Sequence, residues 1–194
     1  MTALLWVLLL ASADREIRVI ADGPGATQAT LQRFEGGKPA GPAVRVAVGR
    51  AGVAASKKEG DGHSPAGTYR VESIFGHASA AAAARHRFQL PYRQLTPLTR
   101  CVDDPASRNY NRILEETPVN KDWKSAEAML IPDYQWGAVI SYNTASPQPA
   151  AGSCIFLHVT DSIGKPTAGC TAMPEPALLE LLRWITPGTR ITWR

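Results

Sequence analysis

The sequence predicts a β-rich α/β fold, mainly β, in which mixed sheets are joined by loops and a few short helices. A length of 194 residues is enough for one domain with a sizeable core and too short for two ordinary ones. Segments that alternate apolar and polar residues follow one another through short turns rich in Gly and Pro, which is typical of β structure. One segment near the end of the chain has helical spacing instead.

Six segments have the alternation or the apolar content expected of strands. They are 16–20, 30–35, 43–49, 68–75, 137–142 and 153–159. Gly36 and Gly37 turn the chain after the second segment, and the run Ser64-Pro65-Ala66-Gly67 leads into the fourth. These strands predict the β-rich body of the protein.

The helical predictions are fewer. Residues 176–185 place Leu178, Leu182 and Ile185 at helical spacing, with a Pro at the start, so we expect a helix there. The alanine-rich run 78–84 fits either a short helix or a surface insertion. Between 91 and 135 the chain is polar and carries five Pro, which predicts a long excursion with only short helices, the best candidate being 122–130.

Bulk composition limits the possible functions. Hydrophobic residues make up 44% of the chain and charged residues 20%, the proportions of a soluble globular protein. The net charge is +4, but Lys and Arg are scattered without a basic block, so we expect no nucleic-acid partner. We expect a monomer. The four His residues and three Cys residues form no cluster with metal-ligand spacing, so no metal and no cofactor is expected.

The first ten residues are apolar, and Ala11-Ser12-Ala13 follows as a small-x-small cleavage pattern. We interpret residues 1–13 as an export signal and 14–194 as the mature domain, which places the protein in the periplasm or cell envelope. The alternatives are a buried first strand or a start codon assigned too far downstream. The apolar run is too short to span a bilayer, so no membrane span is expected.

Cys170 and His158 are the strongest chemical signal in the chain. A thiolate is a strong nucleophile, and an imidazole is the side chain best suited to take its proton near neutral pH. His158 ends an apolar run, and Cys170 follows twelve positions later after Gly169. Gly169 lets the backbone approach a substrate carbonyl, and N–H groups of such a turn can bind an oxyanion. The alternatives are a buried Cys in a tight turn and a core His.

Two further groups of residues are weaker candidates. Tyr142 and Asn143 end the strand before the His strand, where they can bind a peptide substrate or act only in packing and turn formation. The runs 103–105 and 109–111 can line a site for an amine or ammonium group, or serve as turn and capping residues.

The stretch from His158 to Cys170 resembles the catalytic signature of the YkuD-type L,D-transpeptidases, enzymes that remodel peptidoglycan. The family pattern is a strand-borne His, a loop, and then Ser/Thr-His-Gly-Cys, which His158, Thr167, Gly169 and Cys170 match. Ala168 stands where the family usually has a second His, so the chain most resembles a branch with Ala-Gly-Cys. Residues 61–70 and 187–193 resemble the Pro-x-Gly-x-aromatic segment and the final strand of the family, and the likeness extends over roughly 15–194.

The resemblance implies a YkuD-like domain in which His158 activates Cys170 for acyl transfer on peptidoglycan stem peptides. It also implies that Thr167 and Gly169 contribute to substrate or oxyanion binding, and that a backbone carbonyl orients His158. Asp161, which is near His158 in the sequence, is the alternative orienting group. A hydrolase that cuts the same bonds, a non-catalytic wall-binding homologue and a structural envelope protein are the alternatives. If Cys170 is the nucleophile, Cys101 and Cys154 are left to form a bridge, or to remain two unpaired buried thiols.

Overall fold

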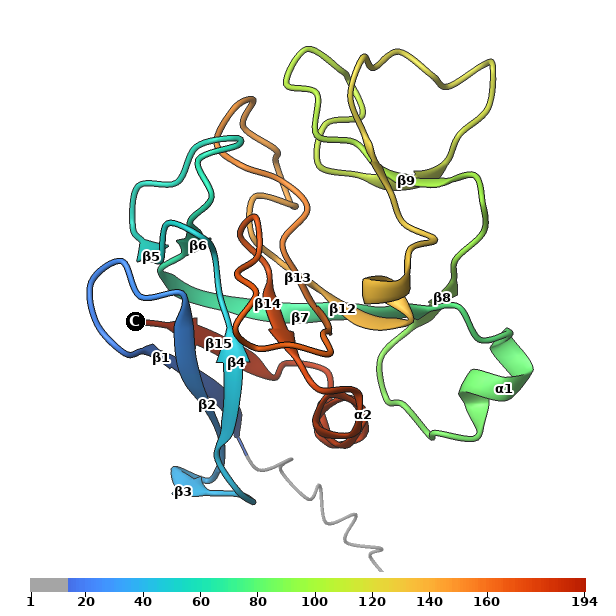
Figure 1. Ribbon diagram of the computed structural model, residues 1–194. Helices are drawn as coiled ribbons and strands as arrows, with labels where there is room; N and C mark the ends of the chain where they lie inside the picture. Colours follow the sequence, from blue (N-terminus) through green and yellow to red (C-terminus); the bar gives the residue numbers. More distant parts are fainter. Residues whose placement is uncertain (1–13) are drawn as a thin grey trace, which may run out of the picture.

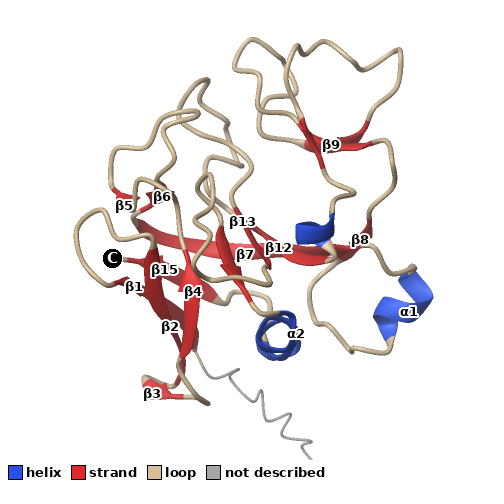
Figure 2. Cartoon of the chain, in the orientation of Figure 1, coloured by secondary structure: helices blue, strands red, loops and turns tan. Residues whose placement is uncertain are grey.

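Eight strands close into a mixed barrel that forms the body of the protein (Figures 1 and 2). The computed structural model describes residues 14–194, so the export signal expected at 1–13 lies outside the described residues. In order around the barrel the strands are β1 (Arg15–Ala21), β15 (Arg190–Trp193), β7 (Gly67–Gly76), β12 (Trp136–Ile140), β13 (Phe156–Val159), β14 (Thr171–Met173), β4 (Val44–Ala47) and β2 (Gln28–Glu35). Pairing of β2 with β1 closes the ring.

Two of the barrel pairs are parallel, β1 with β15 and β13 with β14, and the others are antiparallel. Two short strands extend this sheet: β3 (Lys38–Pro39) pairs with β2, and β8 (Tyr92–Gln94) pairs with β7. β5 (Val53–Ala54) and β6 (Ser64–Pro65) form a separate parallel pair. The fold is therefore mainly β with mixed strand directions, as the alternating segments predicted.

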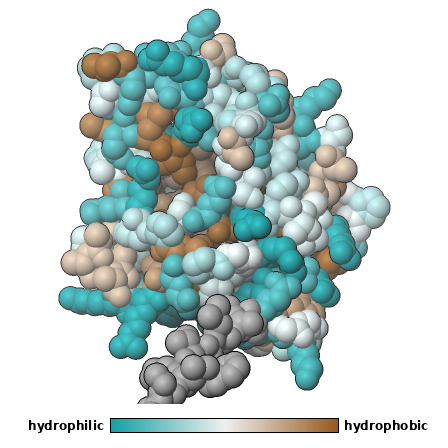
Figure 3. Space-filling view, turned by 180° about the vertical axis from the view of Figure 1, so that it is seen from behind, coloured by the Kyte–Doolittle hydropathy of each residue, from teal (hydrophilic) through white to brown (hydrophobic). Residues whose placement is uncertain are grey.

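The main core fills the barrel with the apolar residues of each alternating strand. Ile17 and Val19 of β1, for example, are fully buried, because alternate side chains of a strand point to the same face. Helix α2 (Glu175–Trp184) packs against β12 and β13 and buries Leu178, Leu181 and Leu182. This confirms the helix predicted at 176–185. On the face seen in Figure 3, hydrophobic surface is broken into patches between hydrophilic side chains.

Residues 95–131, which we call the lobe, stand apart from the barrel at the end of β8 and β12 (Figure 1). The lobe contains a small sheet of β10 (Ile113–Glu115), β9 (Thr99–Cys101) and β11 (Glu127–Ala128). A single 3-10 turn, η1 (Pro132–Tyr134), leads from it into β12. The alanine-rich run contributes the short helix α1 (Ala80–Ala84), which is capped by Ser79.

The helix predicted at 122–130 is wrong. Within this segment Glu127 and Ala128 form β11, which pairs with Cys101 and Arg100 of β9, and the Met129 N–H donates to the Thr99 carbonyl. Met129 is fully buried. Pairing with β9 and burial of Met129 therefore outweigh the helix propensity of the Ala, Glu, Met and Leu residues.

Candidate active site

The barrel brings Cys170 and His158 to one cavity. His158 lies on β13 and Cys170 immediately precedes β14, and these two strands are parallel neighbours with His158 opposite Ala172. Both side chains line a cavity of about 200 Å³, which we call the His158 cavity. Its wall also includes Glu127, Tyr134, Thr160, and residues 165–168 of the loop before Cys170.

The turn before Cys170 requires glycine. Gly169 has φ +151°, and a Cβ at this position would lie 2.8 Å from the His63 carbonyl oxygen. Thr167 fixes the turn from inside: its hydroxyl accepts from the Gly169 N–H at 3.1 Å and donates to the Cys170 carbonyl at 2.7 Å. The Ser64 hydroxyl donates to the Gly169 carbonyl at 2.7 Å, so the segment that enters β7 supports the turn from outside.

The Cys170 sulfur is free, because Cys101 and Cys154 form the disulfide. The thiol is buried, donates to the Cys154 carbonyl at 3.3 Å, and accepts from the Phe156 N–H at the same distance. Burial raises the pKa of Cys170 well above its ordinary value; a negative charge on Glu127 adds to this, while the Phe156 N–H and Lys57 oppose it. The resting group is a neutral thiol, which needs a base to become a nucleophile.

His158 is held in the tautomer that such a base requires. Its Nδ1 lies 2.9 Å from the Val159 carbonyl oxygen, and since a carbonyl only accepts, Nδ1 carries the proton and Nε2 is the basic nitrogen. The Val159 carbonyl, rather than the Asp161 carboxylate, therefore orients the ring. Burial lowers the pKa of His158, so the ring is neutral at neutral pH. The Tyr134 ring packs edge-on against the imidazole, with centroids 5.4 Å apart.

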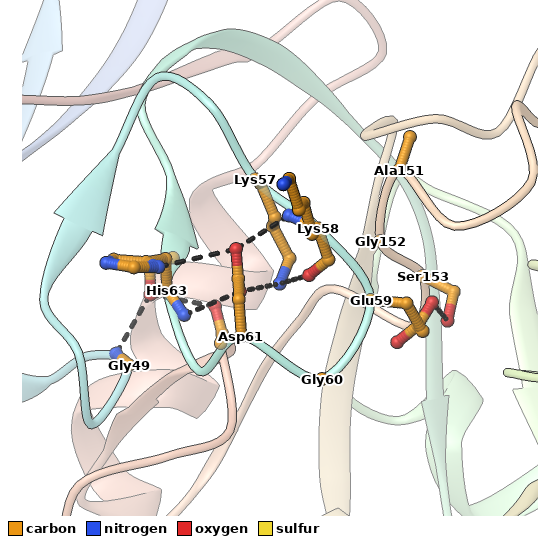
Figure 4. A network of polar contacts seen from close by, with 12 residues as sticks. Gly49, Lys57, Lys58, Glu59, Gly60, Asp61, His63, Ala151, Gly152 and Ser153 are labelled. Atoms are coloured by element: carbon orange, nitrogen blue, oxygen red, sulfur yellow. Dashed lines mark hydrogen bonds and ion pairs between the residues drawn. The ribbon is translucent and has the colours of Figure 1, made fainter.

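A second cavity of about 160 Å³ reaches Cys170 from another side, and we call it the Lys57 cavity. Lys57 is buried there and pairs with Asp61 at 3.0 Å, where Asp61 also accepts from the Lys58 and His63 N–H groups (Figure 4). Burial opposes ionisation of Asp61, but these hydrogen bonds together with Lys57 hold its pKa below the ordinary value. The loop 57–63 is thus a rigid wall beside Gly169.

Cys170, Ala168 and Glu127 line both cavities, so Cys170 borders each of them. Glu127 comes from β11 of the lobe, and its carboxylate accepts from the Tyr134 hydroxyl at 2.9 Å. Burial raises the pKa of Glu127 to about 7; the Tyr134 hydrogen bond lowers it, while the negative charges of Asp103 and Glu59 raise it. Sequence reasoning missed Glu127 because it lay in the predicted helix. Its position two residues before the buried Met129, in strand alternation, was the available signal.

Tyr142 and Asn143 line neither cavity. The Tyr142 hydroxyl donates to the Ala151 carbonyl at 2.6 Å, and the Asn143 amide donates to the Gln148 and Gly152 carbonyls. Asn143 also has positive φ, which suits a turn. Both side chains therefore fasten the loop 143–152.

The polar runs 103–105 and 109–111 contain one residue that lines a cavity and others that act in caps and turns. Asp103 lines the Lys57 cavity, and its Oδ1 is buried without a hydrogen-bond partner. Asp104 caps backbone N–H groups of Ala106 and Lys124. Asn111 binds the Tyr142 and Asn143 carbonyls and the Cys154 N–H, so it acts in a turn that joins the lobe to the barrel.

Two properties of residues 14–194 complete the description. No helix in this part of the chain is long and apolar enough to cross a membrane. In the same range, no three His, Cys, Asp or Glu side chains group so that they can hold a metal ion.

Comparison with known proteins gives one family match. The YkuD family, the L,D-transpeptidase catalytic domain, matches residues 17–192. Comparison with curated protein sequences finds no match.

Three solved structures are similar to this chain at low identity. The helical cell shape determining protein Pgp2 from Campylobacter jejuni is 13% identical over 93% of this chain and 48% of its own, with a TM-score of 0.47. The Ldtfm–avibactam carbamoyl enzyme is 12% identical over 94% and 49%, with a TM-score of 0.41. Mycobacterium tuberculosis L,D-transpeptidase 1 is 10% identical over 92% and 62%, with a TM-score of 0.39. The chain thus spans between 48% and 62% of the length of these solved proteins.

Proposed function

Because the chain belongs to the YkuD family of L,D-transpeptidase catalytic domains, we propose that it catalyses cysteine-dependent acyl transfer on peptidoglycan stem peptides. The observation that supports this most is that a free thiol, Cys170, and an oriented imidazole, His158, line one cavity. We place the chain with family members that carry Ala-Gly-Cys. Although Ala168 replaces the second His of the usual family pattern, the Cys170 thiol and the His158 imidazole are both present in this chain.

In the first half-reaction, His158 Nε2 takes the Cys170 proton as the sulfur attacks the carbonyl of the L,D bond in a tetrapeptide stem. The backbone N–H of Cys170 receives the oxyanion, a contribution of about 3 kcal/mol. The Gly169 N–H is already bound to Thr167. The C–N bond breaks, the terminal D-amino acid leaves with the proton from His158, and a thioester remains on Cys170. An amine of a second stem then resolves the thioester.

The same proposal assigns the protein to the periplasm or cell envelope, with residues 1–13 as its export signal. The Cys101–Cys154 disulfide supports a location outside the cytoplasm, because disulfides persist in oxidising compartments. The cell-wall substrate of the family supports the same location.

Incubation of the purified protein with muropeptides, followed by mass spectrometry of both protein and products, tests the proposal. We expect a thioester adduct on Cys170 and cross-linked dimers from the wild type. Cys170→Ser should give no adduct, and His158→Gln should lose at least about a hundredfold in adduct formation. His86→Gln is the matched control, because His86 lies by α1 and Arg183, away from both cavities.

The products separate the alternatives. Hydrolysed stems without dimers would replace the transferase by an L,D-carboxypeptidase or endopeptidase. Absence of any adduct, with a carbapenem as well as with muropeptides, would leave a non-catalytic wall-binding protein.

A further inference from the structure

Among the described residues, Glu127 is the acidic side chain that lines both cavities at Cys170, and the two steps described above do not use it. It lines both the His158 cavity and the Lys57 cavity, as Cys170 does. An acyl acceptor that reaches the thioester from either cavity therefore passes this carboxyl group.

The lobe holds Glu127 in this place by covalent and hydrogen-bonded links. In the small sheet Glu127 is the register partner of Cys101, which is bridged to Cys154. The Cys154 carbonyl in turn accepts from the Cys170 thiol. On its other side Glu127 accepts from the Tyr134 hydroxyl, and the Tyr134 ring contacts His158.

Electrostatic repulsion makes simultaneous ionisation of Glu127 and Cys170 unfavourable. Both groups lie in a poorly solvated site. A negative charge on Glu127 raises the pKa of Cys170, and a negative charge on either group raises the pKa of Tyr134. Asp103 and Glu59 add negative charge on the Lys57 side, and Lys57 is already paired with Asp61. In the thioester, as in the resting thiol, the sulfur carries no charge, so this repulsion acts only while the thiolate exists and Glu127 can ionise once the thioester has formed.

We propose that Glu127 is a further catalytic residue, the base that takes a proton from the acyl acceptor in the second half-reaction. The proposal rests on the acyl transfer proposed above and deepens it. While the thiolate forms, Glu127 is protonated and leaves the sulfur as the single new negative charge. After acylation, Glu127 is a carboxylate.

The atoms of this step balance. An acceptor ammonium, R–NH₃⁺, gives one proton to the Glu127 carboxylate and becomes R–NH₂. The nitrogen attacks the thioester carbon, the C–S bond breaks, and a second nitrogen proton passes to the sulfur, which restores the Cys170 thiol and leaves a new amide. Glu127 then releases its proton to solvent. The acceptor is thus a primary amine that arrives protonated.

Glu127→Gln separates the two half-reactions, because Gln keeps the size and still accepts from the Tyr134 hydroxyl. We expect the variant to form the thioester at the wild-type rate or faster, to accumulate it, and to lose about a hundredfold in transfer to an amine. Intact-protein mass spectrometry measures the adduct, and product analysis measures transfer. Glu72→Gln, on an exposed carboxylate, is the matched control.

The pH dependence of the wild type gives a second measurement that needs no variant. We expect transfer to rise with pH through about 7, where Glu127 ionises, while thioester formation does not rise there. The titratable and charged groups that face Glu127 are Tyr134, Asp103, Glu59 and Cys170, together with His158, Asp133 and Lys165 in the His158 cavity and Lys57 in the Lys57 cavity. In Glu127→Gln the inflection of the transfer step should be absent.

Three results would overturn the proposal. Glu127 would be excluded as the base if Glu127→Gln transferred the acyl group to an amine at the wild-type rate. It would also be excluded if the transfer rate of the wild-type protein showed no inflection near pH 7. Equal loss of thioester formation and transfer in a variant of unchanged thermal stability would assign Glu127 to the first half-reaction. Absence of a thioester in the wild type is a different failure, since it removes the proposed function and this inference with it.

Discussion

The barrel and the lobe contribute to the candidate site in different ways. The barrel supplies the proposed base, His158, on β13, and the proposed nucleophile, Cys170, immediately before β14, the parallel neighbour of β13. The lobe supplies Glu127 and Asp103 from a segment with three short strands and long irregular connections. The regular region positions the proposed reacting groups, and the irregular region sets the charge and solvation around them.

The two regions meet at a second, smaller core that includes Cys170 itself. The lobe side contributes Leu95, Cys101 and Met129, and the barrel contributes Phe75 and Phe156, with Tyr134 between them. Because the thiol lies in this apolar contact, burial raises the pKa of Cys170. The reactivity of a barrel residue therefore depends on how the lobe packs.

Of the changes considered, removal of the disulfide is expected to have the largest effect on the packing of the lobe against the barrel. The bridge joins residues 53 apart, so the double variant Cys101→Ser with Cys154→Ser should lose about 2–4 kcal/mol of unfolding free energy. We also expect loss of transfer, because β11 and Glu127 are tied to the barrel through Cys101. Thermal unfolding with and without reductant measures the first effect. Reductant should destabilise the wild type and leave the double variant unchanged, and equal stability in all four samples would contradict the prediction.

Gly169→Ala tests the barrel side. The new Cβ would lie 2.8 Å from the His63 carbonyl in a backbone conformation with φ +151°, so the turn must shift. We expect a loss of about 1–3 kcal/mol of stability and slower thioester formation. Gly23→Ala is the matched control, because no atom lies within 4 Å of its added Cβ, and it should change stability by less than about 0.5 kcal/mol. Normal acylation by Gly169→Ala would show that the turn geometry is not needed.

The pH dependence of acylation separates the proposed role of His158 in the barrel from that of Glu127 in the lobe. Burial lowers the pKa of His158 below 6.5, so the imidazole stays neutral and basic when the pH falls through that value. We expect the rate of thioester formation with a carbapenem to be about as high at pH 6 as at pH 7. Mass spectrometry of samples quenched after set times, at pH values from about 5 to about 8, measures this rate. An acid limb centred at or above about 6.5 would show that His158 titrates as an ordinary histidine.

The sequence predicted the barrel better than the lobe, for physical reasons. Alternation along β1 or β7 is local, so it identified the strands, but closure by the parallel β1–β15 pair joins the two ends of the chain and left no local signal. The pairing of His158 with Cys170 was recognisable because both lie within thirteen residues of sequence. The lobe is held by a disulfide, by side chains such as Asp104 and Asn111 that bind backbone groups, and by contact with the barrel. These constraints are tertiary, so Glu127 and Lys57 were not predicted.

Tyr142→Phe should have the smallest effect and tests a barrel residue that the sequence assigned to substrate binding. The hydroxyl donates to the Ala151 carbonyl and the ring packs edge-on against Tyr69, so the side chain holds the loop 143–152 and lines neither cavity. Removal of the hydroxyl leaves the ring contact and breaks one hydrogen bond, which corresponds to about 1 kcal/mol of stability. We expect thioester formation and transfer at wild-type rates, measured beside a denaturant titration. A raised KM for muropeptides without a change in stability would instead restore Tyr142 as a substrate contact, and would mean that the binding surface extends along the barrel beyond the two cavities.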